Sequence, residues 1–297
     1  MVRPHRFTIN PLTAADNAFQ DAAPAGGDDG AAARAYAEAG ALAHTLRAEG
    51  VGVSLFEDRT GASPDSVFPN NWFTTHPDGR VVLCPMYAPN RRQERRDDVV
   101  DHLRQRFHVS EVIDLSPAER RGEFLEGTGS VVIDHVQRVA YGSRSHRLTP
   151  GIFAEYCRLL GLRPMLFDAV DSAGVPVYHT NVMMSVGQTL AVVAPDLIRQ
   201  PEQRREVIAA LEASGRTIIE IAEHQVRRYA GNVIQLTGAR GPVLALSASA
   251  YDALRQDQLA AIRAVSRIAV ADVTTIERSG GSVRCMLAGI HLPPLTH

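Results

Sequence analysis

Three residues far apart in the sequence have the side-chain types that covalent hydrolysis requires. Cys285 follows a pair of glycines, where the backbone can adopt positive φ angles or approach another group closely, so a thiol there can face a cleft. His179 heads an apolar stretch and has the side chain whose pKa lies nearest neutrality. Glu126 precedes a Gly-Thr-Gly turn, where a carboxylate can orient and stabilise an imidazolium. The three residue types together indicate a nucleophile, an acid–base group and its orienting carboxylate.

Each of these residues also has an ordinary structural explanation. Most free cysteines are small buried hydrophobic residues. A histidine at the start of a strand is more often a hydrogen-bonded structural residue, and a carboxylate beside glycines is often a turn residue that faces water. The combination is therefore more specific than any one of its members.

A cluster of amides lies among aromatic residues in the first quarter of the chain. Asn70 and Asn71 stand between Phe68 on one side and Trp72 and Phe73 on the other. Asparagine is common in turns, so a turn alone can explain the amides. Two adjacent amides flanked by aromatic rings nevertheless favour a pocket for a planar polar group.

The elements that must position these residues follow a repeating pattern. Amphipathic stretches predict helices whose midpoints lie roughly 50 to 60 residues apart, with Thr149 and Ser249 as N-caps of two of them. The predicted helices span 31–49, 91–107, 150–161, 201–214 and about 250–266. Between the helices, β-rich stretches come in threes, and the Asp78-Gly79 pair predicts a hairpin. The last stretches are 268–270 and 284–287, and 51–55 is predicted as the first strand.

The repeating unit of one helix and three strands occurs about five times and favours one closed ring over two ordinary α/β domains. Each unit must bury its apolar face on a neighbour, so we expect a single domain spanning 1–297. Strand connections meet at the centre of such a ring, where polar residues distant in sequence converge. The segment 21–30 is rich in Ala, Gly and Asp and is predicted to be a mobile loop.

Composition and charge exclude several classes of protein. The net charge is -2, which argues against a nucleic-acid binder. The chain has no apolar run near the roughly 18 residues of a membrane span, and its first residues lack the apolar region of a signal peptide. Three widely separated cysteines favour reduced thiols in a cytoplasm and give no zinc-type spacing. A homodimer is compatible with this composition.

The sequence contains no predicted nucleotide-binding loop, and the arginine-rich run at 91–96 is predicted to have no role in the chemistry. The Gly-Thr-Gly-Ser sequence at 127–130 is neither a phosphate-binding loop nor a complete dinucleotide fingerprint. The run Arg-Arg-Gln-Glu-Arg-Arg at 91–96 mixes charges at the start of a predicted helix. We interpret this run as a face of the helix exposed to solvent.

Taken together, the motifs resemble those of the guanidino-group-modifying superfamily, which includes arginine deiminases, dimethylargininases, amidinotransferases and succinylarginine dihydrolase. Four of them resemble most closely the citrulline utilisation hydrolases of that superfamily: Phe-Pro-Asn-Asn-Trp-Phe, Leu-Glu-Gly-Thr-Gly-Ser, Tyr-His-Thr-Asn-Val-Met-Met and Arg-Cys-Met-Leu-Ala. The resemblance covers about 68–291. It implies the α/β fold called a pentein, a five-bladed α/β propeller with three strands and a helix in each blade, in agreement with the repeat.

The resemblance also implies roles for individual residues. Cys285 matches the nucleophile, His179 the general acid/base and Glu126 the carboxylate beside them. Ser145-His146-Arg147 resembles a Ser-x-Arg-Thr element, so Arg147 is expected to bind the substrate's α-carboxylate. Leu148 stands where that element has Thr, which makes this match looser. Weaker candidates for the same task are Arg144, Arg227 and Arg284.

The expected substrate is citrulline. Arginine deiminases have aspartates that hold the guanidinium, and the resemblance matches their positions to Asn71 and Asn181 here. A guanidinium is always charged and offers only donors, and burying it without counter-charges costs several kcal/mol. A ureido group is neutral and offers both donors and an acceptor, which asparagine amides can match. Glu126 remains as the one carboxylate that can balance a cation.

The expected mechanism is attack of the Cys285 thiolate on the ureido carbon, through a covalent S-linked intermediate, with no metal or organic cofactor. The products are ornithine, carbon dioxide and ammonia. The alternatives are deimination of arginine or of a methylated arginine, and a non-catalytic ring like the ribosome anti-association factor of eukaryotes and archaea. A papain-like protease is disfavoured, because it has its Cys before its His.

Overall fold

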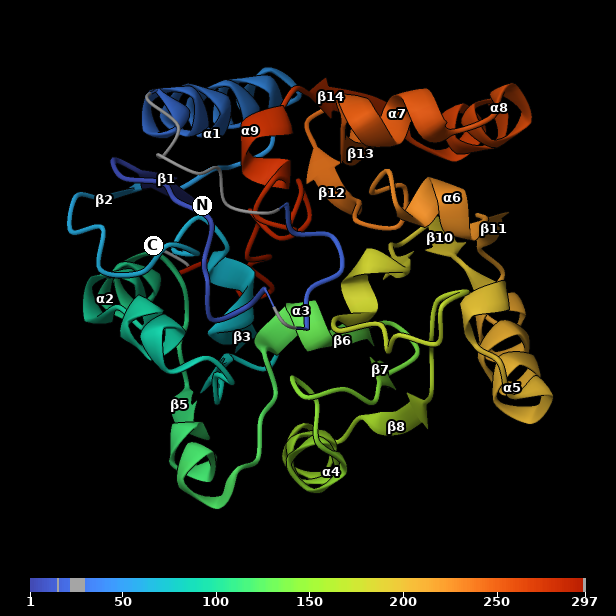
Figure 1. Ribbon diagram of the computed structural model, residues 1–297, viewed down its shortest axis with the longest axis horizontal. Coiled ribbons are helices and arrows are strands. Elements are labelled where there is room, and N and C mark those ends of the chain that lie inside the picture. Colours follow the sequence, from blue (N-terminus) through green and yellow to red (C-terminus); the bar gives the residue numbers. More distant parts are fainter. Residues whose placement is uncertain (15, 22–29, 296–297) are drawn as a thin grey trace.

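The computed structural model describes residues 1–14, 16–21 and 30–295. Within these residues the strands form four three-stranded sheets and one two-stranded sheet. The sheets are arranged in a ring with the longer helices on its outside (Figure 1). The structure therefore confirms the five-bladed α/β propeller. The predicted mobile loop 21–30 lies outside the described residues apart from its two ends, and the assignment of 1–297 to a single domain stays a prediction.

Each three-stranded blade repeats one topology. An inner strand pairs antiparallel with a middle strand, the chain then crosses over through a helix, and an outer strand pairs parallel with the middle one. The blades are β3 (Phe73–Thr75), β4 (Arg80–Leu83) and β5 (Glu111–Asp114); β6 (Val131–Asp134), β7 (Val139–Ser143) and β8 (Arg163–Phe167); β9 (Met184–Val186), β10 (Leu190–Val193) and β11 (Thr217–Glu220); β12 (Ile234–Gly238), β13 (Gly241–Ser247) and β14 (Arg267–Ala271). The remaining blade pairs β1 (Val2–Pro4) with β2 (Phe56–Asp58) in parallel.

The crossover helices cover the outside of the ring and bury one face each. They are α1 (Ala31–Ala48), α2 (Asp97–Arg106), α4 (Pro150–Leu160), α5 (Pro201–Glu212), α7 (Ala248–Ala253) and α8 (Gln256–Val265). Helix α4 begins after Thr149 and ends at Gly161, which has the left-handed φ of 62° that a glycine tolerates there. The shorter elements are α3 (Gly127–Ser130), α6 (Glu223–Val226), α9 (Thr274–Glu277), η1 (Pro69–Asn71), η2 (Pro89–Glu94), η3 (Ser116–Arg121), η4 (Thr180–Val182) and η5 (Pro195–Leu197).

Several predicted elements were wrong in detail. The helix predicted over 91–107 is divided into η2 and α2, because Arg95 and Arg96 have extended backbones. The last predicted helix is divided into α7 and α8, and its cap is Ser247 rather than Ser249, because the Ser247 side chain accepts a hydrogen bond from the Ala250 N–H.

Two predicted strands are absent from the described structure. Residues 51–55 are irregular, and the strand of this blade begins only at Phe56. Residues 284–287 form a turn in which the Cys285 N–H donates to the Ser282 carbonyl. Cys285 is therefore positioned by a turn and not by a β-strand.

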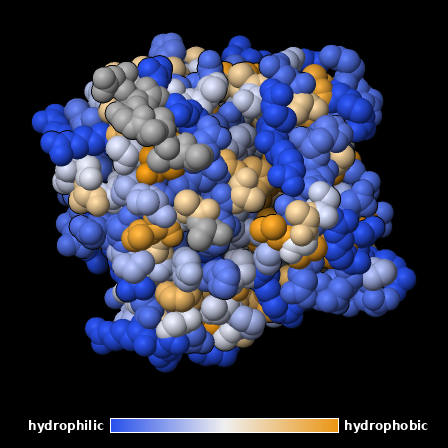
Figure 2. Space-filling view, viewed as in Figure 1, coloured by the Kyte–Doolittle hydropathy of each residue, from blue (hydrophilic) through white to orange (hydrophobic). Residues whose placement is uncertain are grey.

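The face of the ring shown in Figure 1 is mostly polar, and its apolar residues lie in separate patches (Figure 2). None of the helices in the described part of the chain is both long and apolar enough to span a bilayer. The apolar core lies between the blades and beneath the helices. The segments that precede the inner strands meet at the centre of the ring, where α3 contacts both η1 and η4.

Histidines gather where two inner strands end. His76 follows β3 and His135 follows β6, and the rings of His135 and His291 lie 3.8 Å apart between centroids. His76 is 3% exposed and its Nε2 lies 2.9 Å from the Thr74 hydroxyl oxygen. Burial lowers the pKa of His76 to about 3, so this ring is neutral in the folded protein at pH 7.

A neutral buried His76 makes the protein less stable in acid. Its folded-state pKa of about 3 lies below the unfolded value of 6.5, so the unfolded chain binds a proton first. The contribution of neutral His76 to the free energy of unfolding is therefore complete above pH 6.5 and is lost as the pH falls toward 3. We expect a loss of about 2 kcal/mol between pH 6.5 and 5. Urea unfolding of the wild type and of His76→Gln at several pH values measures this loss of stability. The stability difference between the two proteins should change over this range, and parallel pH profiles would contradict the assignment.

Candidate active site

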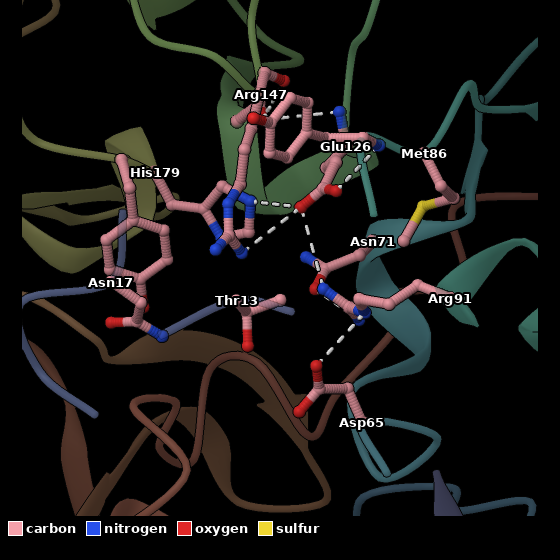
Figure 3. A network of polar contacts seen from close by, with 12 residues as sticks. Thr13, Asn17, Asp65, Asn71, Met86, Arg91, Glu126, Arg147 and His179 are labelled. Carbon is pink, nitrogen blue, oxygen red and sulfur yellow. Dashed lines mark hydrogen bonds and ion pairs between the residues drawn. The ribbon is translucent and has the colours of Figure 1, made fainter. Parts of the chain in front are cut away.

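His179 and Glu126 form a buried pair at the centre of the ring. His179 immediately precedes η4, and Glu126 immediately precedes α3. The His179 Nε2 lies 2.8 Å from the Glu126 Oε2, and the two residues are 2% and 0% exposed. Figure 3 shows the imidazole and the carboxylate directed toward one another. The pair can orient an imidazole and stabilise its protonated form.

Two arginines surround the carboxylate of Glu126. The Arg91 Nη1 lies 3.5 Å and the Arg147 Nη1 3.6 Å from the Glu126 Oε2, and the Tyr87 N–H donates to Oε1 at 3.0 Å (Figure 3). Burial alone raises the pKa of Glu126, but Arg147, the hydrogen bond with His179 and Arg91 together hold it well below its ordinary value. Glu126 is therefore an anion whose charge is already balanced within the protein.

His179 is neutral in this arrangement. Burial lowers the pKa of His179 to about 4, although the hydrogen bond and the charge of Glu126 act in the opposite direction. A neutral imidazole can accept a proton at pH 7 and then hold it as an imidazolium next to Glu126. The pair can therefore act as a base first and as an acid afterwards.

Gly129 has no side chain and so leaves space for the side chains of Asn71 and His179. A Cβ atom on Gly129 would overlap the Asn71 amide nitrogen and would lie 2.8 Å from the His179 Cε1. Only glycine therefore fits between these side chains. This close packing explains the glycine-rich turn after Glu126.

Cys285 is buried with its sulfur against two asparagine amides. The Asn232 Nδ2 lies 3.2 Å and the Asn181 Nδ2 3.5 Å from the Cys285 Sγ. Cys285 is 3% exposed. Both amides direct an N–H group at the sulfur. A thiolate held by amides can act as a nucleophile.

The paired amides of η1 present polar atoms without partners. Asn71 accepts a hydrogen bond from the Arg91 Nη2 at 3.0 Å through Oδ1, while its Nδ2 has no partner among the described residues. Because a guanidinium only donates, Arg91 fixes this orientation, and the Asn71 N–H₂ remains a free donor. Neither polar atom of the buried Asn70 side chain has a partner in the described structure. Phe68 lies close beside Gly281, next to the turn of Cys285.

Arg91 contradicts the prediction of a solvated face over residues 91–96. It is 2% exposed and forms a buried ion pair with Glu94, with 2.8 Å between Arg91 Nε and Glu94 Oε1. Its Nε also lies 3.5 Å from the Asp65 Oδ2. Burial opposes the charge of Arg91, but Glu94, Asp65 and Glu126 raise its pKa. Within the run, Arg91 and Glu94 therefore belong to a buried network, whereas Arg92, Arg95 and Arg96 are partly exposed.

Arg147 is engaged by a carboxylate of the N-terminal segment. Its Nε and Nη2 donate to the two oxygens of Asp16 at 3.0 and 2.6 Å. Arg147 is 2% exposed, and its guanidinium lies over the Tyr178 ring at 4.8 Å. A bidentate carboxylate is the partner that a substrate's α-carboxylate would provide. The Asp16 carboxylate thus binds Arg147 where the sequence predicts the α-carboxylate of the substrate.

The other arginine candidates lie outside this network. Arg144 and Arg227 are largely exposed and pair with Asp168 and Asp171, respectively. Arg284 donates to the Leu287 carbonyl at 2.8 Å. We therefore retain Arg147 as the candidate for carboxylate binding.

The sequence interpretation missed Asp65, Asp16 and Asn232. Asp65 is buried, and its Oδ1 has no partner in the described part of the chain. Asp65 lies three residues before Phe68 and six before Asn71. Its nearness to this amide and aromatic cluster was a signal in the sequence that could have identified it as a candidate site residue. The other two residues follow a loop and a glycine without a distinguishing pattern. Among the described residues, no group of three or more His, Cys, Asp and Glu is placed to hold a metal ion.

Comparisons with known proteins add a family and a fold. The family model described as "N,N dimethylarginine dimethylhydrolase, eukaryotic" matches residues 3–292. Comparison with curated proteins finds no match. Among solved structures, the product-bound N-terminal domain of ArgZ, an arginine dihydrolase from the ornithine–ammonia cycle in cyanobacteria, is 16% identical with a TM-score of 0.74. That match covers 96% of this chain and 94% of the domain.

Two further solved structures are similar over most of the chain. The complete ArgZ chain matches with 16% identity and a TM-score of 0.74, over 96% of this chain and 39% of its own, so the chain spans about two fifths of that protein. A dimethylarginine dimethylaminohydrolase bound as an adduct with S-methyl-L-thiocitrulline matches with 17% identity and a TM-score of 0.64, over 96% of both chains. At these identities the likeness establishes the fold.

Proposed function

Because this chain belongs to the N,N dimethylarginine dimethylhydrolase family, within the guanidino-group-modifying pentein superfamily, we propose that it is a cysteine hydrolase of a ureido amino acid. The proposed substrate is citrulline. The proposed products are ornithine, carbon dioxide and ammonia. Cys285, His179 and Glu126 are the proposed catalytic residues, and no metal or organic cofactor takes part.

The orientation of Asn71 is the observation that carries this proposal. Its oxygen accepts from Arg91, so its unpartnered Nδ2 offers only a donor. A ureido oxygen can accept that hydrogen bond, whereas a guanidinium has no acceptor. Glu126 is meanwhile neutralised by Arg91 and Arg147. A guanidinium in this site would therefore face a donor at Asn71 where it needs an acceptor.

The first half of the reaction forms the covalent intermediate. The Cys285 thiolate attacks the ureido carbon, and the electron pair of the carbon–oxygen double bond moves onto oxygen. Asn71 Nδ2 donates to this developing oxyanion, which a preorganised donor stabilises more than the ground state. His179, which holds the thiol proton, delivers it to the leaving nitrogen as the C–N bond breaks. Glu126 stabilises the imidazolium between these steps.

The second half of the reaction releases the enzyme. His179 is neutral again and accepts a proton from water as the hydroxide attacks the S-linked carbonyl. Collapse breaks the C–S bond and returns the thiolate. The resulting carbamic acid splits into carbon dioxide and an amine. Citrulline and one water thereby give ornithine, carbon dioxide and ammonia in balance.

Product analysis tests the proposal. L-citrulline, L-arginine and N,N-dimethylarginine are each incubated with purified wild type and with Cys285→Ala, and the products are separated by mass. Ornithine from citrulline, absent with the variant, is the expected result. Citrulline formed from arginine or from dimethylarginine, without ornithine, would overturn the substrate assignment and leave the thiol chemistry in place.

Arginine dihydrolysis is a second candidate, favoured by the likeness to the arginine dihydrolase ArgZ over nearly the whole chain. Such a reaction consumes two waters and releases carbon dioxide, ornithine and two molecules of ammonia. Its second hydrolysis needs the same thiolate and the same His179. Ornithine formed from arginine as fast as from citrulline would select this candidate.

The α-amino acid end of the substrate has two candidate partners. Asp65 has a buried oxygen without a partner among the described residues, which suits an α-ammonium, and Arg147 suits the α-carboxylate. Because Asp16 pairs with Arg147, the substrate's carboxylate must displace Asp16. Removing the Asp16 carboxylate should therefore strengthen substrate binding.

We expect Asp16→Asn to lower the KM for citrulline by about three- to tenfold, because the competent state of Arg147 is then populated without displacement. The change in kcat should be small. Steady-state kinetics measure both constants. Asp21→Asn is the matched control, since Asp21 lies on the same segment and is mostly exposed beside Arg278. A higher KM in Asp16→Asn would show that Asp16 helps to assemble the binding site.

A further inference from the structure

We propose that Asn232 is a catalytic residue that holds the Cys285 thiolate through its amide nitrogen and receives an N–H of the substrate through its amide oxygen. This inference rests on the proposed hydrolysis by Cys285 and adds a residue to it. Neither the spacing nor the motifs of the sequence single out Asn232.

The contacts of the amide nitrogen fix the orientation of the side chain. Asn232 Nδ2 lies 3.2 Å from the Cys285 Sγ, 3.2 Å from the Asn181 carbonyl oxygen and 3.3 Å from the Asn181 Oδ1. A rotated amide would place Oδ1 against these two oxygens and the sulfur. The observed orientation therefore presents an N–H donor to the sulfur.

The amide oxygen is left without a partner. Asn232 is 0% exposed, and its Oδ1 receives no hydrogen bond from the described residues. Buried acceptors in folded proteins are almost always satisfied, so an open one beside the nucleophile is suited to a ligand. A ureido nitrogen offers the N–H that this oxygen lacks. Asn71 Nδ2 and Asn232 Oδ1 then match the oxygen and nitrogen sides of one ureido group.

The backbone pays a conformational cost to place this residue. Tyr229 has a positive φ of 64°, which is strained for a bulky aromatic residue and is commonest at functional positions. Its hydroxyl donates to the Glu277 carbonyl at 2.6 Å, which holds the turn. A Cβ on Gly231 would overlap the Val182 carbonyl oxygen. The turn is thus packed against the segment of Asn181.

In the described part of the chain, the direct contacts of the Cys285 sulfur come from amides and not from charged side chains. Arg91 pairs with Glu94 and Arg147 with Asp16, and Arg284 donates to the Leu287 carbonyl. His179 is directed at Glu126. The hydrogen bonds that the described structure gives to the Cys285 Sγ come from Asn232 and Asn181. Two amides therefore contact the sulfur directly, and the buried Arg284 next to Cys285 adds a positive charge nearby.

Alkylation of Cys285 measures the thiolate contact without any need for turnover. The rate with iodoacetamide is followed by peptide mass spectrometry from pH 5 to 10 in wild type, Asn232→Ala and Asn232→Asp. We expect the midpoint pH to rise by about one unit in Asn232→Ala and further in Asn232→Asp, where a carboxylate replaces the donor. Cys84 and Cys157 are internal controls, because burial raises the pKa of each to about 12. Gln258→Ala removes a buried amide elsewhere and should leave the midpoint unchanged.

Kinetics on the same variants test the contact with the substrate. Asn232→Asp keeps an acceptor and loses the donor to sulfur, so it should lower kcat with little change in KM, whereas Asn232→Ala should also raise KM. An unchanged alkylation midpoint in both variants would overturn the inference, even with citrulline turnover intact. A shifted midpoint in a protein that hydrolyses none of the tested amino acids would support the thiolate contact and overturn the proposed function.

Discussion

Replacing Cys285 with serine is expected to reduce the kcat for citrulline by about 10⁴-fold or more, because a hydroxyl is a far weaker nucleophile than a thiolate at neutral pH. The change is nearly isosteric in a turn where Cys285 is 3% exposed. The Asn232 and Asn181 amides that contact the sulfur can also contact a hydroxyl. Folding and substrate binding should therefore survive while the chemical step is lost.

Two measurements separate this result from a folding defect. Rates come from the release of ornithine, and calorimetric titration with citrulline measures binding by Cys285→Ser. Cys157→Ser is the matched control, since Cys157 is a buried cysteine of α4 outside the site and its replacement should preserve kcat. Rapid acid quenching of the wild type with citrulline should trap a mass adduct on Cys285. A serine variant that retains a tenth of wild-type kcat would remove Cys285 from the mechanism.

The ring and the assembly of the site follow from patterns that a sequence displays. Strand and helix periodicity repeats along the chain, and closing such a repeat brings the starts of the inner strands together. That geometry brings Glu126 and His179 within hydrogen-bonding distance although 53 residues separate them. The glycine-rich turn after Glu126 also has a structural reason, since Gly129 leaves space for the side chains of Asn71 and His179.

The buried charges could not be predicted in the same way. Arg91 lies in a run of mixed charge that is typical of a solvated helix face, and only the closed ring places this run beside Glu126. The arginine is satisfied by Glu94 three residues later and by Asp65 from another loop. Whether a charged residue is buried depends on which loop crosses the centre, and local periodicity does not determine that.

Asp16 and Asn232, which contact Arg147 and Cys285, could not be predicted from the sequence either. Asp16 follows no repeat and contacts Arg147 across 131 positions of the chain. Asn232 precedes β12 in what resembles an ordinary strand start, and its role depends on the positive φ of Tyr229. A backbone strain of this kind has no sequence pattern when the residue is not glycine. These positions become visible only once the elements are placed in space.

Changing Glu126 to glutamine should damage both catalysis and folding, because the carboxylate serves His179 and two arginines at once. The amide removes the negative charge that lies 3.5 Å from Arg91 and 3.6 Å from Arg147 in a fully buried position. Breaking a buried ion pair on one side leaves uncompensated charge, so we expect the free energy of unfolding to fall by about 3 kcal/mol. Asp16, Glu94 and Asp65 still balance the arginines in part, which should keep the variant folded.

The catalytic loss should exceed what instability explains. Without the carboxylate, the imidazolium that forms during proton transfer is no longer stabilised or oriented, and kcat should fall by about 10³-fold. Urea unfolding gives the stability, and citrulline turnover below the unfolding transition gives kcat. Glu119→Gln is the matched control, since Glu119 also pairs with two arginines, Arg92 and Arg95, but outside the site. If Glu126→Gln and Glu119→Gln lose similar activity at equal folded fractions, Glu126 acts only as a structural counter-ion and His179 works without it.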